Sequence, residues 1–115
     1  MKKYKIYIPI YSCNLTVIIT KNFDKVAKKY LEDSECYDAM VRTKEKNGIK
    51  EYLYVQRLGI SYGDIAHEAK HIVNRIFRDR GQLLDSANDE AECYLLGYIV
   101  NEIHSKISEV TKKNC

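Results

Sequence analysis

The segment His67-Glu68-Ala69-Lys70-His71 decides how the rest of this 115-residue chain is interpreted. The motif lies in a stretch whose apolar residues recur at spacings of three and four, which is typical of one face of a helix. These residues are Ile65, Ala69, Ile72, Val73, Ile76 and Phe77. Ser61 is a suitable N-terminal cap, and Gly81 can end the helix in the left-handed conformation. We therefore expect a helix over about 61–79.

Two histidines four residues apart on a helix lie on the same face, one turn from each other. Both imidazoles of His67 and His71 can then bind one Zn²⁺, at about 2.0–2.1 Å from each nitrogen. Glu68 lies close to that face and can take a proton from a metal-bound water. The composition of the chain gives only about 0.006 chance matches to H-E-x-x-H. The alternative is a solvent-exposed helix face whose histidines bind no metal.

A catalytic zinc site needs a third protein ligand. The extended motif with a third histidine is not present, because Asn74 and Phe77 stand where Gly and His are required. His104, the remaining histidine, is interpreted as a surface or core residue. A group of acids at 88–92 opens the next expected helix and offers the other candidates.

Among these acids we prefer Glu90 to Glu92 and Asp89 as the third ligand. The face of Glu90 also carries Tyr94 and Gly97, whereas Glu92 shares an aliphatic face. A glycine in the middle of a helix costs about 1 kcal/mol relative to Ala, and close packing of two helices would justify it.

Two further side chains are candidates for supporting roles. Tyr94 follows Glu90 by one turn and can hydrogen-bond a ligand or a transition-state oxyanion; the alternative is a core tyrosine with a satisfied hydroxyl. Asp64 precedes His67 by one turn and can orient its free ring nitrogen. The alternative for Asp64 is an acid that stabilises the N-terminus of the helix.

The first half of the chain predicts a small sheet. Alternating or β-branched patterns indicate strands at 4–11, 15–20, 37–43 and 49–55. Asn47-Gly48 separates the last two strands and is typical of a tight hairpin. Asn22 can cap a helix over about 23–33. We expect one α+β domain over 1–115: a mostly antiparallel ββαββ sheet, then the H-E-x-x-H helix, then a long helix from 88 or 89 to about 108.

The last helix is apolar nearly all round, which predicts that it is buried. A chain of this length has room for one domain, which excludes a doubly wound dinucleotide fold, a kinase and a (β/α)₈ barrel. Residues 1–60 hold 12 Lys and Arg against 7 Asp and Glu, and residues 61–115 hold 7 against 9. The lysines of the first half are interpreted as a solvated face, with nucleic-acid binding as a weaker alternative.

Sequence features also bear on the cellular compartment. No segment of the sequence has the 18 apolar residues of a membrane span, and the N-terminus has no apolar signal region. The four cysteines form no C-x-x-C pair and are interpreted as reduced thiols: Cys13, Cys36, Cys93 and Cys115. We therefore expect a cytoplasmic protein.

H-E-x-x-H followed by Glu-Ala on a second helix resembles the gluzincin type of zincin metallopeptidase. The size and element order are similar to the minimal zincin core of ImmA/IrrE-like and SprT-like proteins and of small zincin-like proteins encoded by phages. The resemblance implies a Zn²⁺ cofactor held by His67, His71 and Glu90, with Glu68 as general base. The chain departs from the ImmA/IrrE-like pattern at Lys70, where Gly is usual.

The function expected from these patterns is zinc-dependent hydrolysis of peptide bonds. The substrate would be a peptide or protein that adds to a sheet edge near 49–55, as in zincins generally. The alternative is a zincin-fold module that binds zinc and a protein partner without cleaving it.

Overall fold

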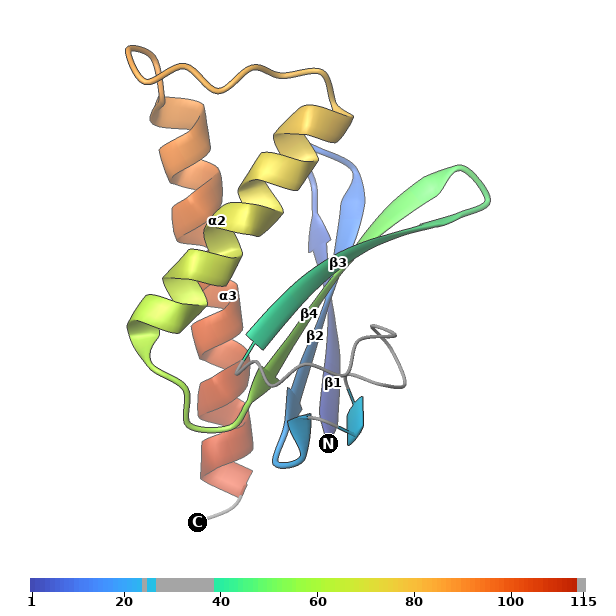
Figure 1. Cartoon of the computed structure of the whole chain (residues 1–115), viewed down its shortest axis with the longest axis vertical. Coiled ribbons are helices and arrows are strands. Elements are labelled where there is room, and N and C mark those ends of the chain that lie inside the picture. Colours follow the sequence, from blue (N-terminus) through green and yellow to red (C-terminus); the bar gives the residue numbers. More distant parts are fainter. Residues whose placement is uncertain (24, 27–38, 114–115) are drawn as a thin grey trace.

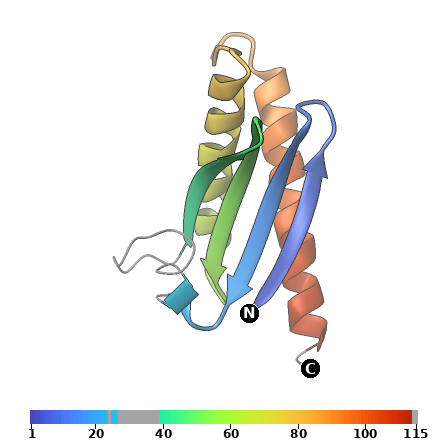
Figure 2. The same ribbon diagram turned by 90° about the vertical axis from the view of Figure 1, so that its right-hand side faces the viewer.

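The computed structural model describes residues 1–23, 25–26 and 39–113. Its strands are β1 (Lys2–Ile8), β2 (Cys13–Thr20), β3 (Ala39–Lys46) and β4 (Ile49–Arg57). Its helices are α2 (Tyr62–Asp79) and α3 (Glu90–Lys113). Figures 1 and 2 show α2 and α3 on the same face of the sheet, where they form one layer. The predicted α+β class is confirmed.

The strand order of the sheet is β1-β2-β4-β3. β1–β2 and β3–β4 are antiparallel hairpins, but β2 and β4 pair in parallel. Two of the three pairings are therefore antiparallel, in line with the predicted mostly antiparallel sheet, and the parallel β2–β4 pairing makes the sheet mixed. In this order β4 lies between β2 and β3, and β3 forms one edge of the sheet.

The inner position of β4 corrects the predicted substrate edge at 49–55. Tyr52 and Tyr54 are buried in the core shared with the helices, while Leu53 and Val55 belong to a second buried cluster. A strand with apolar side chains buried on both faces belongs inside a sheet. The two edges of this sheet are instead β1 and β3.

Local signals set the turns correctly. Asn47 and Gly48 both have positive φ, at 55° and 78°, as the tight hairpin requires. The first strand ends at Ile8, three residues before the predicted end, because residues 9–12 form a turn in which the Ser12 N–H donates to the Pro9 carbonyl. The Asn22 side chain accepts a hydrogen bond from the Lys25 N–H, as an N-cap does. The rest of the helix predicted over 23–33 lies largely outside the described residues.

The predicted bounds of α2 are confirmed almost to the residue. The Ser61 hydroxyl accepts from the Asp64 N–H at 3.1 Å, and Gly81 has a φ of +70° just beyond the helix. The six apolar residues at helical spacing are all buried: Ile65, Ala69, Ile72, Val73, Ile76 and Phe77. This stripe places α2 against the sheet and α3.

α3 is amphipathic, which corrects the prediction of a helix buried all round. Leu95, Ile99 and Ile103 face the core, whereas the side chain of Tyr94 is 75% exposed. The reason is that no described element covers the side of α3 that faces away from the sheet (Figure 1). α3 also continues to Lys113, five residues past the predicted end. Neither helix in the described part of the chain is long and apolar enough to cross a membrane.

Candidate metal centre

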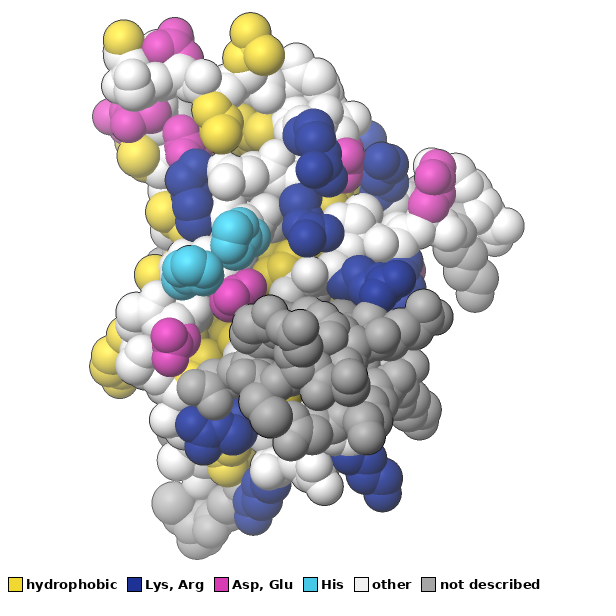
Figure 3. Space-filling model, viewed as in Figure 1, with side chains coloured by type: hydrophobic (Ala, Val, Ile, Leu, Met, Phe, Trp, Pro, Cys, Tyr) yellow, Lys and Arg dark blue, Asp and Glu magenta, His cyan; other side chains and the backbone are white. Residues whose placement is uncertain are grey.

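His67 and His71 lie side by side on the exposed outer face of α2. Figure 3 shows a pair of histidine side chains at the surface over this helix. Their Nε2 atoms are 3.2 Å apart, and the two rings meet edge to face with centroids 4.9 Å apart. The helix alone produces this arrangement, because residues i and i+4 are stacked one turn apart.

The distance between the two nitrogens fits one edge of a zinc site. Two nitrogens bound tetrahedrally to one Zn²⁺ at about 2.0–2.1 Å are separated by about 3.3 Å. Without a metal, the same separation fits an N–H···N hydrogen bond between two neutral imidazoles, in which one ring donates and the other accepts. The donor types and their separation therefore fit zinc.

Glu68 stands beside the pair in a more buried position. Its Oε1 lies 3.9 Å from Nε2 of His67, and its side chain is only 16% exposed. Burial raises the pKa of Glu68, the neighbouring histidines and Arg75 oppose that rise, and Asp64 adds to it. A carboxylate with a raised pKa is a stronger base than an ordinary surface glutamate.

Tyr54 and Gln56 are site residues that sequence reasoning missed. Both side chains are buried on β4, and the Tyr54 hydroxyl donates to Oε1 of Gln56 at 2.7 Å. Burial raises the pKa of Tyr54, and the charges of Glu68 and Asp64 raise it further, so the phenol stays protonated beneath this part of α2. The sequence feature that could have identified these two residues is Gln56, because it is a polar residue at the end of an apolar strand.

The structure brings Glu92, rather than Glu90, to α2. The Glu92 carboxylate forms an ion pair with the ammonium of Lys70, and its side chain is 16% exposed. Lys70 also donates to Oδ1 of Asn74 at 2.7 Å. Glu90 is exposed in the first turn of α3, and Asp89 precedes that turn, with its carbonyl accepting from the Cys93 N–H.

Tyr94 and the histidines belong to different surfaces. Tyr94 lines an apolar hollow with Tyr98 and the turn after β1, so it is not brought to the histidine pair. Gly97 has no atom within 4 Å of the position where a Cβ would stand, so no close helix contact explains this glycine. His104 is exposed and its ring meets that of Tyr62 at a tilt, with ring centroids 6.0 Å apart, as expected for a surface histidine.

No third ligand completes the pair within the described ranges. Among those residues there is no group of three or more His, Cys, Asp or Glu side chains that could hold a metal ion. Glu92 is the acid of α3 held beside α2, through Lys70, and it would have to leave that ion pair to bind a metal.

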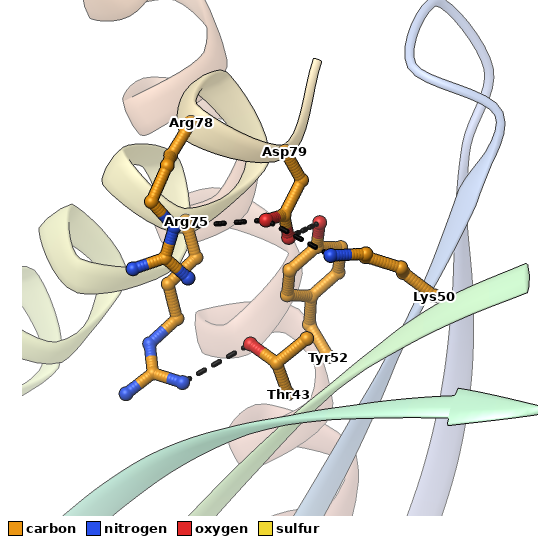
Figure 4. Close-up of polar contacts among 6 residues, drawn as sticks. All are labelled: Thr43, Lys50, Tyr52, Arg75, Arg78 and Asp79. Atoms are coloured by element: carbon orange, nitrogen blue, oxygen red, sulfur yellow. Dashed lines mark hydrogen bonds and ion pairs between the residues drawn. The ribbon is translucent and has the colours of Figure 1, made fainter. Parts of the chain in front are cut away.

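A second polar cluster lies at the other end of α2 (Figure 4). The Asp79 carboxylate accepts a hydrogen bond from the Tyr52 hydroxyl at 2.6 Å and pairs with Lys50 at 3.2 Å and Arg78 at 3.6 Å. Burial alone would raise the pKa of Asp79, but the Tyr52 hydrogen bond and the Lys50 charge outweigh it and lower that pKa.

This cluster and one further bond attach α2 to the strands beneath it. Arg75 donates from its guanidinium to the Thr43 hydroxyl of β3 at 3.0 Å (Figure 4). Because the Asp79 carboxylate is already surrounded by donors, we interpret the cluster as structural.

Comparison with models of protein families, with curated proteins and with solved structures found no match to this chain.

Proposed function

We propose that this protein binds Zn²⁺ through His67 and His71 and hydrolyses peptide bonds with Glu68 as general base. The observation that carries the proposal is the 3.2 Å separation of the two Nε2 atoms on an exposed helix face. A hydrolytic site must admit both a metal and a substrate, and this face of α2 is open to solvent.

Glu92 is the proposed third ligand, in place of Glu90. Its carboxylate is held beside α2 by Lys70, the residue directly before His71. Lys70 keeps a partner if the carboxylate moves away, because it is also bound to Asn74. After the exchange the Lys70 ammonium would therefore keep a hydrogen-bond acceptor in the Asn74 side chain.

When bound, zinc would supply an acidified water and polarise a carbonyl. Glu68 would accept the proton of that water on a carboxylate oxygen and pass it to the leaving amine. Its shielded position suits this role, because a carboxylate with a raised pKa holds a transferred proton more readily. Tyr54 and Gln56 would keep the floor beneath Glu68 closed to water, since both are buried and bonded to each other.

The substrate would lie along β3, the sheet edge next to α2. An extended peptide can add to a free edge through main-chain hydrogen bonds. The bond from Arg75 to Thr43 holds this edge against the helix that carries Glu68. A peptide on β3 would therefore be presented at a constant distance from the general base.

A second candidate function is zinc binding without hydrolysis. It is favoured by one observation, namely that Glu92 is occupied by Lys70 and no described side chain completes the ligand set. A zinc held by two histidines and a partner protein would suit a regulatory module.

Zinc content and activity together test the proposal. Wild-type protein dialysed against zinc should retain one zinc per chain by elemental analysis, and His67→Ala should lose it. His104→Ala is the matched control and should retain zinc, because the His104 ring contacts Tyr62 and does not belong to the pair. Zinc-free wild-type protein under these conditions would refute both candidate functions.

Activity separates the two candidates. Glu68→Gln should retain zinc and lose hydrolysis of fluorescent casein, because an amide cannot accept the proton. If the wild-type, zinc-loaded protein cleaves no more casein than Glu68→Gln, then the peptidase proposal is wrong and the binding module remains.

A further inference from the structure

An apolar hollow is lined by residues of the first half of α3 and of the turn that follows β1. Figure 2 shows these two backbone segments in its upper part. The volume of the hollow is about 560 Å³, and its lining includes Ile8, Ile10, Tyr11, Tyr94, Leu95 and Tyr98. Ile10 is 88% exposed and Tyr94 is 75% exposed. The apolar side chains at the rim of the hollow are therefore accessible to a binding partner.

The hollow adjoins the edge of β1 with which no described strand pairs, and a hydrogen bond shows which main-chain groups face that edge. The Tyr98 hydroxyl donates to the Tyr7 carbonyl at 3.3 Å, so this carbonyl points away from β2. In an antiparallel pair, alternate residues direct both their N–H and C=O groups to the partner strand, and the residues between them point away. Tyr7, Lys5 and Lys3 therefore present their main-chain groups at the edge.

The pairing on the other side of β2 agrees with this orientation. The Leu58 N–H donates to the Thr20 carbonyl, so Thr20 faces β4. Its neighbour Ile19 must then face β1, where it pairs with Lys2. Lys2 thus faces β2, and Lys3 faces outward. Two independent hydrogen bonds therefore give the same pattern.

We propose that the β1 edge and the adjacent hollow bind an extended segment of another protein, in which apolar and acidic residues alternate. In antiparallel pairing, residues opposite Ile8 and Ile6 would project to the α3 side, where the hollow lies. Residues opposite Lys5 and Lys3 would project to the other face, beside the two ammonium groups. This alternation follows from the two-residue period of a strand.

The lysine charges on β1 favour an acidic partner over a second copy of this chain. The two-fold register that uses the whole of β1 places Lys5 opposite Lys5, and like charges directly opposite are destabilising. Lysines on an edge strand ordinarily discourage pairing. Acidic residues opposite these lysines would instead favour pairing. The Lys5 side chain is accessible to such a residue, because it is 61% exposed although it contacts Glu51.

A labelled hexapeptide tests the proposal on the whole protein. Leu-Thr-Phe-Glu-Val-Glu places Leu and Phe opposite Ile8 and Ile6, and its two glutamates opposite Lys5 and Lys3. Fluorescence anisotropy should show saturable binding, and the same peptide with lysines for glutamates should not bind. Tyr94→Ser should weaken binding by about tenfold, because it removes an aromatic wall of the hollow. Tyr62→Ser is the matched control, since Tyr62 is 77% exposed on α2, and it should bind as wild type.

Methylation of peptide nitrogens tests the strand geometry directly. Methyl groups on the two glutamate amides should abolish binding, because these N–H groups would face β1. Methyl groups on the Phe and Val amides should leave it intact. Equal binding of both methylated peptides, or of Tyr94→Ser and wild type, would overturn the proposal. The proposal would also be overturned if sedimentation showed a dimer of the wild-type protein, Tyr94→Ser abolished that dimer, and no peptide bound.

Discussion

Removal of the Asp79 carboxylate should destabilise the protein more than its position at a helix end suggests. Asp79 is the last residue of α2, where the helix dipole disfavours an acid. Its side chain is nevertheless only 6% exposed and accepts the Tyr52 hydroxyl at 2.6 Å. Asp79→Ala would leave that hydroxyl buried without an acceptor, and we expect a loss of about 2–4 kcal/mol in the free energy of unfolding.

A double-mutant cycle isolates the Tyr52–Asp79 hydrogen bond. Tyr52→Phe should cost about 1–2 kcal/mol, because the carboxylate keeps Lys50 as a partner. The double variant leaves no orphaned hydroxyl, so its cost should fall short of the sum by about 1–2 kcal/mol. Urea unfolding followed by far-UV circular dichroism measures all four proteins. If the two single costs add in the double variant, the hydrogen bond does not stabilise the fold and the reasoning is refuted.

The lowered pKa of Asp79 also fixes the sign of a pH effect. A carboxyl group whose pKa is lower in the folded than in the unfolded state contributes its full stability above the unfolded value, near 3.8. That contribution is lost as the pH falls through the lower, folded value. The stability difference between wild type and Asp79→Asn should therefore be constant from about pH 5 to 7 and shrink below about pH 4. A difference that grows on acidification would contradict this assignment.

Four further substitutions test the site and the backbone. Glu92→Gln should weaken zinc binding by about tenfold in a competition titration, whereas Glu90→Gln should not change it, and the reverse result would restore Glu90 as the ligand. Gly97→Ala should stabilise the protein by about 0.5–1 kcal/mol, because the site is open and helical; a lower melting temperature would show an unseen contact. Gly48→Ala should cost about 1 kcal/mol in urea unfolding, because Gly48 has a φ of +78°, and no cost would mean that the turn relaxes easily.

Local sequence signals predicted the elements that depend on neighbouring residues. The capping serine, the apolar stripe and the terminal glycine fixed α2, because each acts within one or two turns. Asn47-Gly48 determined the β3–β4 hairpin through two positive φ values. The spacing of His67 and His71 likewise predicted a pair of adjacent imidazoles, and the structure has them 3.2 Å apart.

The candidate third ligand could not be chosen in the same way. Glu90 and Glu92 are two residues apart on one helix, so their side chains point in nearly opposite directions, about 160° apart around the helix axis. Which of them meets α2 depends on how α3 rotates about its axis when it packs on the sheet. An all-round apolar pattern leaves that rotation undetermined. The sequence pattern favoured the face that carries Tyr94, whereas the structure pairs Glu92 of the other face with Lys70 of α2.

By itself the sequence determined the H-E-x-x-H helix, its paired histidines and the tight hairpin, since these follow from interactions between residues close in the chain. Only the tertiary structure decided that β4 lies inside the sheet, that β1 and β3 form its edges, and that Glu92 faces α2. The physical reason is that strand order and helix rotation are set by which apolar faces bury each other. Residues far apart in the sequence make those contacts, and no local pattern records them.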